Sequence, residues 1–406
     1  MARTADGHRL RRRPRDRKAQ IARASAEAFS ELGYHGVSME AIAARVGISA
    51  AALYRHYPSK YDLLRGAVLN LGQQLVDCTA EVDGAGPAQV LDQLVSALID
   101  TALSNRASGG LYRWEGRYLR GDDRVQLLDQ MRTVHRRLHG PLLQLRPELT
   151  ARQCSVLSTA TLSVVGSVVD HRAKLPAAQA HELLGQLASA VLNTELPEVG
   201  AESITTPERP GSGAPIYEAL LVESLRLFHA NGYRDTAMGD IAAAVGIPTS
   251  TIYKYFSGKS DILAAAFRRA ADRLSADLAE ITATVTDPAD ALAAMIDAYV
   301  SRSFDQPELD YVYYSDRLSM TPSDQRILRV LQRSMVESWV EMVVAVRPEW
   351  TAGQARFAVH AAMAVVIDLG RLAHYAATAE ARVTVQRLVD VTLLGGHRMR
   401  TTSPAG

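Results

Sequence analysis

The sequence predicts an all-α protein in which one helical module occurs twice in tandem. Apolar residues recur at spacings of three and four, as in Leu91, Leu94, Val95 and Leu98, and no run alternates with period two. The chain has 406 residues, of which 47% are hydrophobic and 22% charged, so several domains can bury cores of their own. The third observation is an internal repeat, which determines the domain organisation.

The repeat extends over most of the chain. Residues 29–64 align without a gap with residues 228–263, and 14 of the 36 positions are identical. Further along, residues 146–151 (RPELTA) match residues 347–352 (RPEWTA). A repeat of this length is too long for a solenoid unit, so each copy is expected to form its own core.

The repeat, together with changes in composition, predicts the domain boundaries. Residues 197–215 contain four prolines and three glycines, which is typical of a linker. We call the short N-terminal part of each copy its head and the longer helical part that follows its body. The predicted order is a basic arm at 1–18, a first head at 19–65, a first helical body at 66–196, the linker at 197–215, a second head at 216–264 and a second body at 265–400.

Each head has the pattern of a helix-turn-helix. In the first head a short helix is expected to begin near Ser38 and to bury Ala43, and Gly47 suits the left-handed residue of a tight turn. Ser49 can cap the second helix, and Leu53 can pack that helix on the first.

The second head repeats this pattern. Ala242, Gly246 and Ile252 occupy the matching positions, and Pro248 is expected in the first turn of the second helix. Two copies of one pattern are much stronger evidence for a helix-turn-helix than a single copy.

This pattern resembles the TetR family of one-component repressors. The resemblance rests on Gly33, Ile-Ala, Val-Gly-Ile, Tyr54 and Lys60, followed by Asp-Leu-Leu, and it covers about 50 residues of each copy. It implies a three-helix DNA-binding head, a bridging fourth helix and a helical body that senses a ligand. The last two helices of such a body normally pair with those of a second body.

The resemblance also implies which residues contact DNA. Tyr54, Lys60, Tyr253 and Lys259 are expected at phosphates, since a lysine at a helix N-terminus favours an anion there. Base reading is expected from the exposed start of each recognition helix. For the two tyrosines the alternative is an aromatic at the edge of the core. The full predicted DNA-binding set is Arg11, Arg12, Arg13, Arg15, Lys18, Ser49, Ala50, Ala51, Tyr54, Arg55, His56, Lys60, Thr249, Ser250, Thr251, Tyr253, Lys254, Tyr255 and Lys259.

The two heads differ in charge. Residues 1–65 contain 13 Lys and Arg against 6 Asp and Glu, a net charge of +7, whereas residues 212–271 contain 6 against 5, a net charge of +1. The arginine run before the first head favours a DNA-contacting arm over a solvated tail. Because the recognition residues also differ, we expect an asymmetric operator.

The bodies are expected to hold an apolar effector, such as a lipid or sterol, in a pocket between helices. Candidate lining residues are aromatic in both copies, although aromatics at helical spacing are also typical of a core. They are Tyr112, Trp114, Tyr118, Tyr311, Tyr313 and Tyr314.

The last two helices of each body are rich in small apolar residues. They are expected at about 151–173 with 177–194 and at about 352–376 with 379–397. With both partners on one chain, an intramolecular pseudo-dimer is favoured, and a homodimer remains the alternative. His171, His360 and His374, near Asp170 and Asp368, favour buried or interface histidines over a metal or catalytic site.

The sequence contains no constellation that supports catalysis, a cofactor or a metal. No apolar run reaches the length of a membrane span, so a cytoplasmic, nucleoid-associated protein is expected. The predicted function is sequence-specific transcriptional regulation, with repression relieved by the effector. Three alternatives remain: an enzyme that carries a helix-turn-helix, a protein that bends DNA without sequence choice, and a regulator whose first head alone binds DNA while the second module binds a partner.

Overall fold

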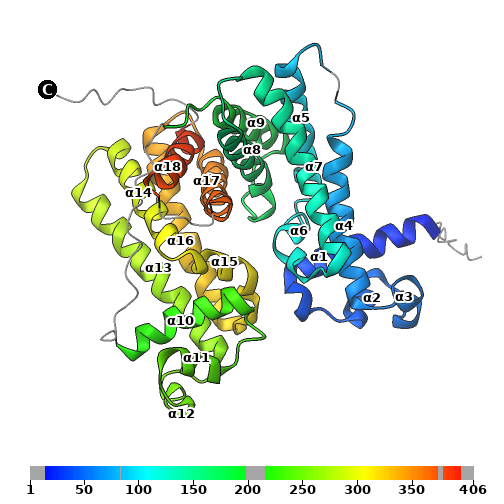
Figure 1. Ribbon diagram of the computed structural model, residues 1–406, viewed down its shortest axis with the longest axis vertical. Coiled ribbons are helices and arrows are strands. Elements are labelled where there is room, and N and C mark those ends of the chain that lie inside the picture. Colours follow the sequence, from blue (N-terminus) through cyan, green and yellow to red (C-terminus); the bar gives the residue numbers. More distant parts are fainter. Residues whose placement is uncertain (1–13, 83, 198–214, 374–377, 395–406) are drawn as a thin grey trace, which may run out of the picture. The chain divides into compact units, whose positions relative to one another are not determined.

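The computed structural model of the chain describes residues 14–82, 84–197, 215–373 and 378–394, with side chains from Arg17 onward (Figure 1). In these ranges the secondary structure is helical, which confirms the predicted all-α fold. None of the helices in these ranges is both long enough and apolar enough to cross a bilayer.

The described residues form two compact units. The first runs to Val76 and takes in Asn105–Arg132 as well. The second consists of Asp77–Ser104 and of the chain from Thr133 onward, so it contains the whole second copy of the repeat.

The first unit contains the first helix-turn-helix. Its elements are α1 (Pro14–Gly36), α2 (Met39–Val46), α3 (Ala50–His56), most of α4 (Lys60–Cys78), α6 (Leu111–Trp114), the 3₁₀ helix η1 (Glu115–Tyr118) and the start of α7 (Gly121–Leu145).

Helix caps fix the turn between α2 and α3. The Ser38 side chain accepts a hydrogen bond from the amide of Ala41 at 3.1 Å, and Ser49 accepts one from Ala52 at 3.2 Å. Gly47 ends α2 with φ of 69°, a conformation that is costly for residues with a Cβ. These observations confirm the predicted caps and the predicted turn.

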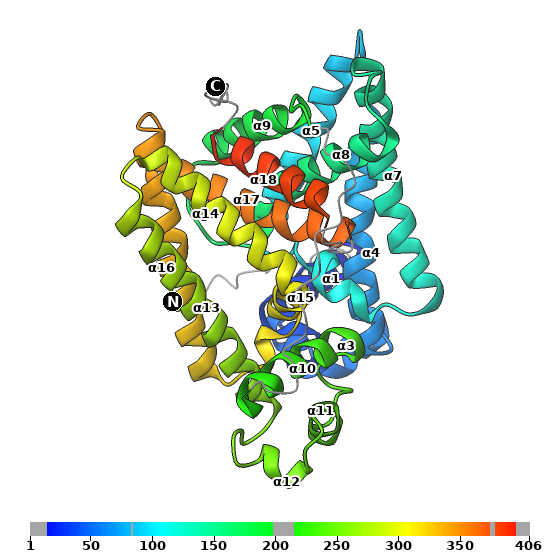
Figure 2. The same cartoon turned by 60° about the vertical axis from the view of Figure 1, so that its left-hand side comes forward.

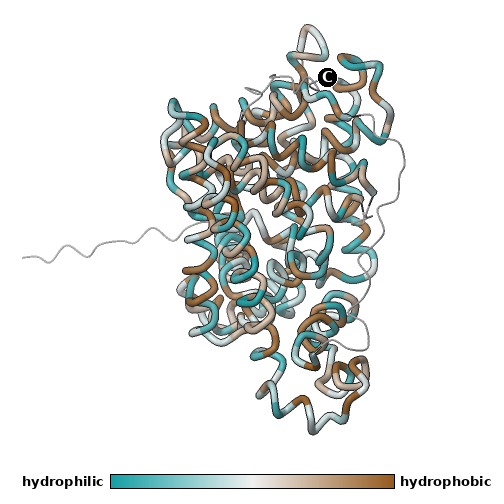
Figure 3. The backbone as a smooth tube through the Cα atoms, turned by 90° about the vertical axis from the view of Figure 1, so that its left-hand side faces the viewer, coloured by the Kyte–Doolittle hydropathy of each residue, from teal (hydrophilic) through white to brown (hydrophobic). Residues whose placement is uncertain are grey.

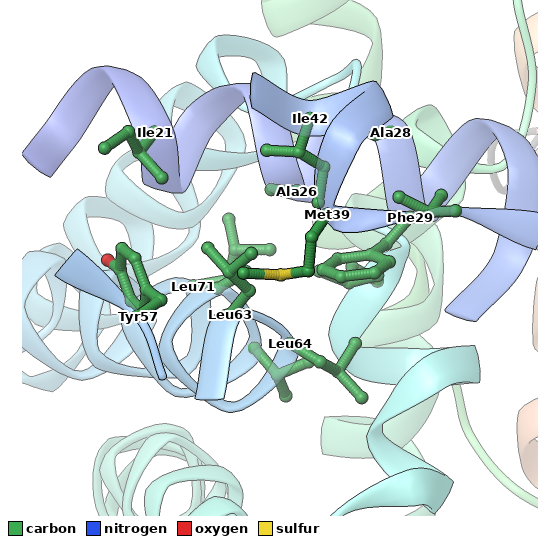
Figure 4. Packing of buried hydrophobic residues seen from close by; sticks show 14 of the residues in the cluster. Ile21, Ala26, Ala28, Phe29, Met39, Ile42, Tyr57, Leu63, Leu64 and Leu71 are labelled. Carbon is green, nitrogen blue, oxygen red and sulfur yellow. The ribbon is translucent and has the colours of Figure 1, made fainter. Parts of the chain in front are cut away.

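A single apolar core holds this unit together (Figure 4). Phe29 of α1, Ile42 of α2 and Leu53 of α3 are all 0% exposed and meet Leu64 of α4 there. Because the three helices of the head share this core with α4, the head cannot move independently of α4 without losing buried apolar contacts.

The second unit contains the remaining helices of the first body and the whole second module. From the first body come α5 (Pro87–Ser104), the rest of α7, α8 (Ala151–Gly166), η2 (Ser167–Val169) and α9 (Ala177–Leu192). The second module consists of α10 (Ile216–Asn231), α11 (Met238–Val245), α12 (Thr249–Ile252), α13 (Lys259–Thr284), α14 (Pro288–Asp305), α15 (Pro307–Asp316), η3 (Arg317–Ser319), α16 (Pro322–Val346), α17 (Ala352–Leu372) and α18 (Ala379–Leu394).

The duplicated RPE-x-TA segment makes the same contacts in both copies. Arg146 donates hydrogen bonds to the carbonyls of Leu192 and Thr194, both at 2.9 Å, and Arg347 donates to that of Leu394 at 2.7 Å. The threonine of each segment caps the next helix, with a glutamine three residues on that completes a capping box. The segment thus joins the end of the last helix of each body to the start of the helix before it.

Helices α8, α9, α17 and α18 pack against one another within the second unit. Figure 1 shows α17 between α8 and α18, and Figure 2 shows α17 and α18 side by side; the contacts of α17 with both helices agree. Ser163 of α8 donates a 2.7 Å hydrogen bond to the carboxylate of Asp368 on α17. Hydrophobic and hydrophilic positions alternate along the helices (Figure 3). This is the pattern of amphipathic helices, which bury an apolar face and expose a polar one.

Histidines lie where the two copies meet in this bundle. The ring of His171, which is 6% exposed, stacks on that of His360 with centroids 4.1 Å apart. His374 lies outside the described residues.

Candidate nucleic-acid interface

The first head presents the surface of α3 to solvent. Tyr54 is 46% exposed, and Ser49, Ala51, Arg55 and His56 are also exposed, while Ala50 is half-buried. Leu53 and Tyr57, at 0% and 9% exposure, face the core instead. Helical spacing therefore separates anchoring residues from residues that can reach a groove.

The second head presents a shorter helix. Helix α12 has 4 residues against the 7 of α3, and Tyr253, Lys254 and Tyr255 follow it in a turn. The expectation that Pro248 lies in the first helical turn is wrong, because Pro248 is the N-cap residue with ψ of 142°.

Residue type explains the difference in length. Helix α3 begins with Ala50, Ala51 and Ala52, the best helix formers, whereas α12 begins with Thr249, Ser250 and Thr251, which favour a helix less. Thr249 and Ser250 are exposed and Thr251 is half-buried, while Tyr253 and Tyr255 are 56% and 42% exposed.

Lys60 and Lys259, predicted at phosphates, both form internal hydrogen bonds in the structure. Lys60 Nζ donates to the carbonyl of Val37 at 3.1 Å. Lys259 Nζ donates to the carbonyls of Tyr233, Arg234 and Thr236 at 2.6, 3.0 and 2.7 Å. Burial lowers the pKa of the Lys259 ammonium below its usual value.

Three arginines of α13, just after the second head, form ion pairs. Glu218 of α10 accepts from Arg269 at 2.7 Å and from Arg273 at 3.0 Å, and Arg268 pairs with Asp324 at 2.8 Å. Lys254, by contrast, has no ion-pair partner in the ranges that the structure covers, and the same is true of Arg55 in the first head. These two cations are therefore available to an external anion.

Part of the predicted basic arm lies outside the described residues. This applies to Arg11, Arg12 and Arg13, and to the side chain of Arg15. Lys18 is exposed at the start of α1.

A hydrogen bond that the sequence did not predict joins the first head to the body segment that follows α5. Glu115 of η1, which is 7% exposed, accepts a hydrogen bond from the amide of Tyr34 at 2.6 Å. The rings of Tyr34 and Tyr118 lie 5.1 Å apart beside it. No sequence signal marks this contact, since the two partners are 81 residues apart.

The six aromatic residues proposed to line a pocket are in different environments. Tyr313 and Tyr314 line a cavity in the second body, and Tyr311 packs edge-on against His229 of the second head with ring centroids 4.8 Å apart. In the first unit, Tyr112 and Tyr118 pack against the core of the head, and Trp114 is 8% exposed.

The cavity in the second body has a volume of about 120 Å³ and a mainly apolar lining. Phe267 and Leu274 come from α13, Leu331 and Met335 from α16, and Met363 from α17. Its polar side includes Asp310, whose carboxylate accepts a 2.6 Å hydrogen bond from Ser303. Burial raises the pKa of Asp310, and the bond from Ser303 acts in the opposite direction.

The two heads match the same family of known proteins. Residues 21–67 and 220–266 each match the sequence profile of bacterial regulatory proteins of the tetR family. The chain is 44% identical over 63 residues to the transcriptional activator FasR of Mycolicibacterium smegmatis. These 63 residues are 15% of this chain and 29% of FasR.

Two repressors are also similar. LfrR of the same organism is 30% identical over 133 residues, which is 30% of this chain and 61% of LfrR. KstR of Mycobacterium tuberculosis is 36% identical over 89 residues, 21% of this chain and 39% of KstR. The chain thus spans less than two thirds of the length of each of these relatives.

Two solved structures align with part of this chain. A regulatory protein of the tetR family from Rhodococcus RHA1 is 20% identical, with a TM-score of 0.40. The alignment covers 43% of this chain and 95% of the Rhodococcus chain. The fatty acid degradation regulator FadR from Bacillus halodurans is 19% identical with a TM-score of 0.39, and covers 46% of this chain and 97% of its own.

Proposed function

Because both heads match the profile of the tetR family of bacterial regulatory proteins, we propose that the chain is a sequence-specific DNA-binding transcriptional regulator that carries two heads. The observation that supports this most strongly is the exposed surface of α3, with Tyr54 and Arg55 turned away from a core that Leu53 anchors. A helix held in this way can enter a major groove.

The two heads are proposed to read different half-sites. The first head combines an alanine-rich recognition helix with Arg55, whereas the second offers the hydroxyls of Thr249 and Ser250 with Lys254. Methyl groups, hydroxyls and cations suit different base edges. The operator is therefore expected to be asymmetric.

The first head is proposed to supply most of the affinity for phosphates. Its net charge of +7 exceeds the +1 of the second head, and the arginine arm accounts for much of the excess. Removing residues 1–14 is expected to lower affinity and to flatten its salt dependence, because fewer counterions are released.

The effector is proposed to bind in the cavity of the second body. The lining supports a small apolar molecule with a single polar group, which would lie near Asp310. A cavity of about 120 Å³ is close in size to one that holds a benzene-sized molecule. A lipid or sterol would enter only if the lining side chains moved apart.

The same helices connect this cavity to the second head. Helix α13 starts at Lys259 in the head and lines the cavity with Phe267 and Leu274. On α15, the ring of Tyr313 packs against that of Phe267 with centroids 5.4 Å apart, and Tyr311 packs against His229 of the head. A ligand that separates α13 from α15 would therefore change the position of the head, which supports repression that the effector relieves.

One chain is proposed to act as an intramolecular pseudo-dimer, because α8 and α9 pack on α17 and α18 within one chain.

The full-length repeat and the arginine-rich start are also similar to the tandem TetR-type repressor of the third mammalian-cell-entry operon in mycobacteria, so control of lipid-related genes is proposed. The second candidate, in which only the first head binds DNA, is favoured by the low charge of the second head.

Fluorescence anisotropy with the duplex upstream of the chain's own coding sequence tests this function. The full chain is expected to bind that duplex at least about a thousandfold more tightly than a shuffled duplex of equal length. Equal affinity for both would contradict sequence-specific regulation. Substituting Lys254 with alanine separates the two candidates, because it lowers affinity only if the second head contacts DNA.

A further inference from the structure

Lys259, the first residue of α13, forms hydrogen bonds with the loop that follows α10. An ammonium group has three N–H donors, and the carbonyls of Tyr233, Arg234 and Thr236 accept from Lys259 at 2.6, 3.0 and 2.7 Å. The group also lies 4.8 Å from the centre of the Tyr233 ring, at a distance typical of a cation–π contact. The loop thus provides a ready-made site for this cation.

The first head contains the same arrangement. Lys60, the first residue of α4, donates to the carbonyl of Val37 at 3.1 Å and lies 4.6 Å from the centre of the Tyr34 ring. The repeat matches Lys60 with Lys259 and Tyr34 with Tyr233. Both heads therefore share a contact of this lysine with a loop carbonyl and with a tyrosine ring, although their recognition residues differ.

The loop needs such a partner. Gly232 ends α10 with φ of 88°, and Gly33 has φ of 71° inside α1. The backbone therefore turns sharply at the matching place in both heads. Tyr233, Arg234 and Thr236 lie between α10 and α11, outside either helix, so their carbonyls have no helical donor, and a lysine ammonium can supply three donors at once. The lysine thereby links the α10–α11 loop to α13, the helix that lines the cavity.

We propose that Lys259 and Lys60 are positioning residues, which hold the helix-turn-helix at a fixed angle to the helix that follows it, and that they do not bind DNA phosphates. This inference rests on the proposed DNA-binding function and reassigns two of its expected contacts. To reach a phosphate, Lys259 would have to give up its hydrogen bonds to three carbonyls. Exposed cations such as Lys254 and Arg55 remain for the phosphates.

Two methionine variants of the full chain distinguish positioning from phosphate contact. Lys259→Met and Lys254→Met each remove one charge, five residues apart, and methionine keeps most of the apolar stem. Each variant is titrated with sheared duplex DNA of mixed sequence at a series of salt concentrations. In the absence of DNA, amide hydrogen exchange is followed over residues 232–240.

Lys254→Met is expected to reduce the slope of log affinity against log salt by about 0.9 and to leave amide exchange unchanged. Lys259→Met is expected to lower affinity with an unchanged slope and to speed exchange in the loop by about tenfold or more. Lys259→Arg, which keeps the charge and supplies donors, is expected to restore slow exchange and most of the affinity.

A slope that falls by about 0.9 in Lys259→Met, with loop exchange unchanged, would overturn the proposal. If Lys259→Met unfolds the head, seen as lost protection throughout α11, the pair Lys60→Met and Arg55→Met decides the same contrast in the first head. Failure of the unaltered chain to bind DNA at all would refute the proposed function instead, and the exchange data would still test the lysine contacts.

Discussion

The carboxylate of Glu115 accepts a 2.6 Å hydrogen bond from the backbone amide of Tyr34, across 81 residues of sequence. Glu115 belongs to η1 and Tyr34 to the end of α1, where the first head begins to turn into α2. Beside this bond, the Tyr118 ring contacts both Tyr34 and His35, with centroids about 5 Å away. The first head is therefore joined to the segment that follows α5 by a buried polar contact as well as by its apolar core.

Glu115→Ala is expected to destabilise the first unit by about 1–3 kcal/mol, because the Tyr34 amide is left without its acceptor in a largely buried place. Glu115→Gln keeps a side-chain oxygen that can accept from Tyr34, so it is expected to lose less stability. Chemical denaturation measures both. Equal losses in the two variants would mean that the hydrogen bond to Tyr34 is not the source of the stability.

Tyr54→Phe is expected to weaken operator binding by about tenfold or more while leaving the free energy of unfolding unchanged. The residue is 46% exposed, so its hydroxyl contributes little to the core and is free to reach a phosphate. Anisotropy and thermal unfolding are measured on the same sample. A stability loss with unaltered DNA affinity would assign Tyr54 to the edge of the core instead.

Ala271→Phe is expected to abolish the response to effector and to preserve DNA binding, because Ala271 lines the cavity and a phenyl ring would fill it. Ala276→Phe on the same helix is the matched control, since Ala276 is exposed and does not line the cavity. Release of operator DNA is followed during titration with small apolar compounds. Equal responses in the two variants would place the effector elsewhere.

Asp310→Asn is expected to stabilise the chain at neutral pH and to lose this advantage in acid. Burial raises the pKa of Asp310 above the usual 3.8, so the folded state favours the protonated carboxyl. A carboxyl of this kind contributes stability below its unfolded pKa and loses that contribution as pH rises through its folded pKa. Asparagine cannot ionise, and it can still accept the hydrogen bond from Ser303.

Denaturation curves of both proteins between pH 3 and 8 measure this difference, a range chosen to span the usual carboxyl pKa and neutrality. The two stabilities should converge toward the acid end. A constant difference across the range would show that ionisation of Asp310 does not cause it.

Local chemistry made much of the heads predictable. Ser38, Gly47 and Ser49 define caps and a turn through their own backbones, so the sequence alone places α2 and α3. The repeat then places Gly246 by comparison with Gly47. Such features depend on residues only a few positions apart.

Features that depend on distant partners were not predictable. The contacts of Lys259 with three carbonyls 23 to 26 residues earlier follow from how α13 crosses the end of α10. Similarly, Tyr313 lines a cavity while Tyr311 on the same helix faces His229, because neighbouring positions of a helix point in different directions. Aromatic residues at helical spacing cannot by themselves distinguish these two environments.

The most direct test of the two-headed regulator is a footprint on the DNA upstream of its coding sequence, combined with the mass of the complex measured on the same duplex. One chain per duplex, protecting two neighbouring half-sites of unlike sequence, is the predicted result. Two chains on a symmetric site, or a single protected half-site that Lys254→Ala leaves unaltered, would contradict it.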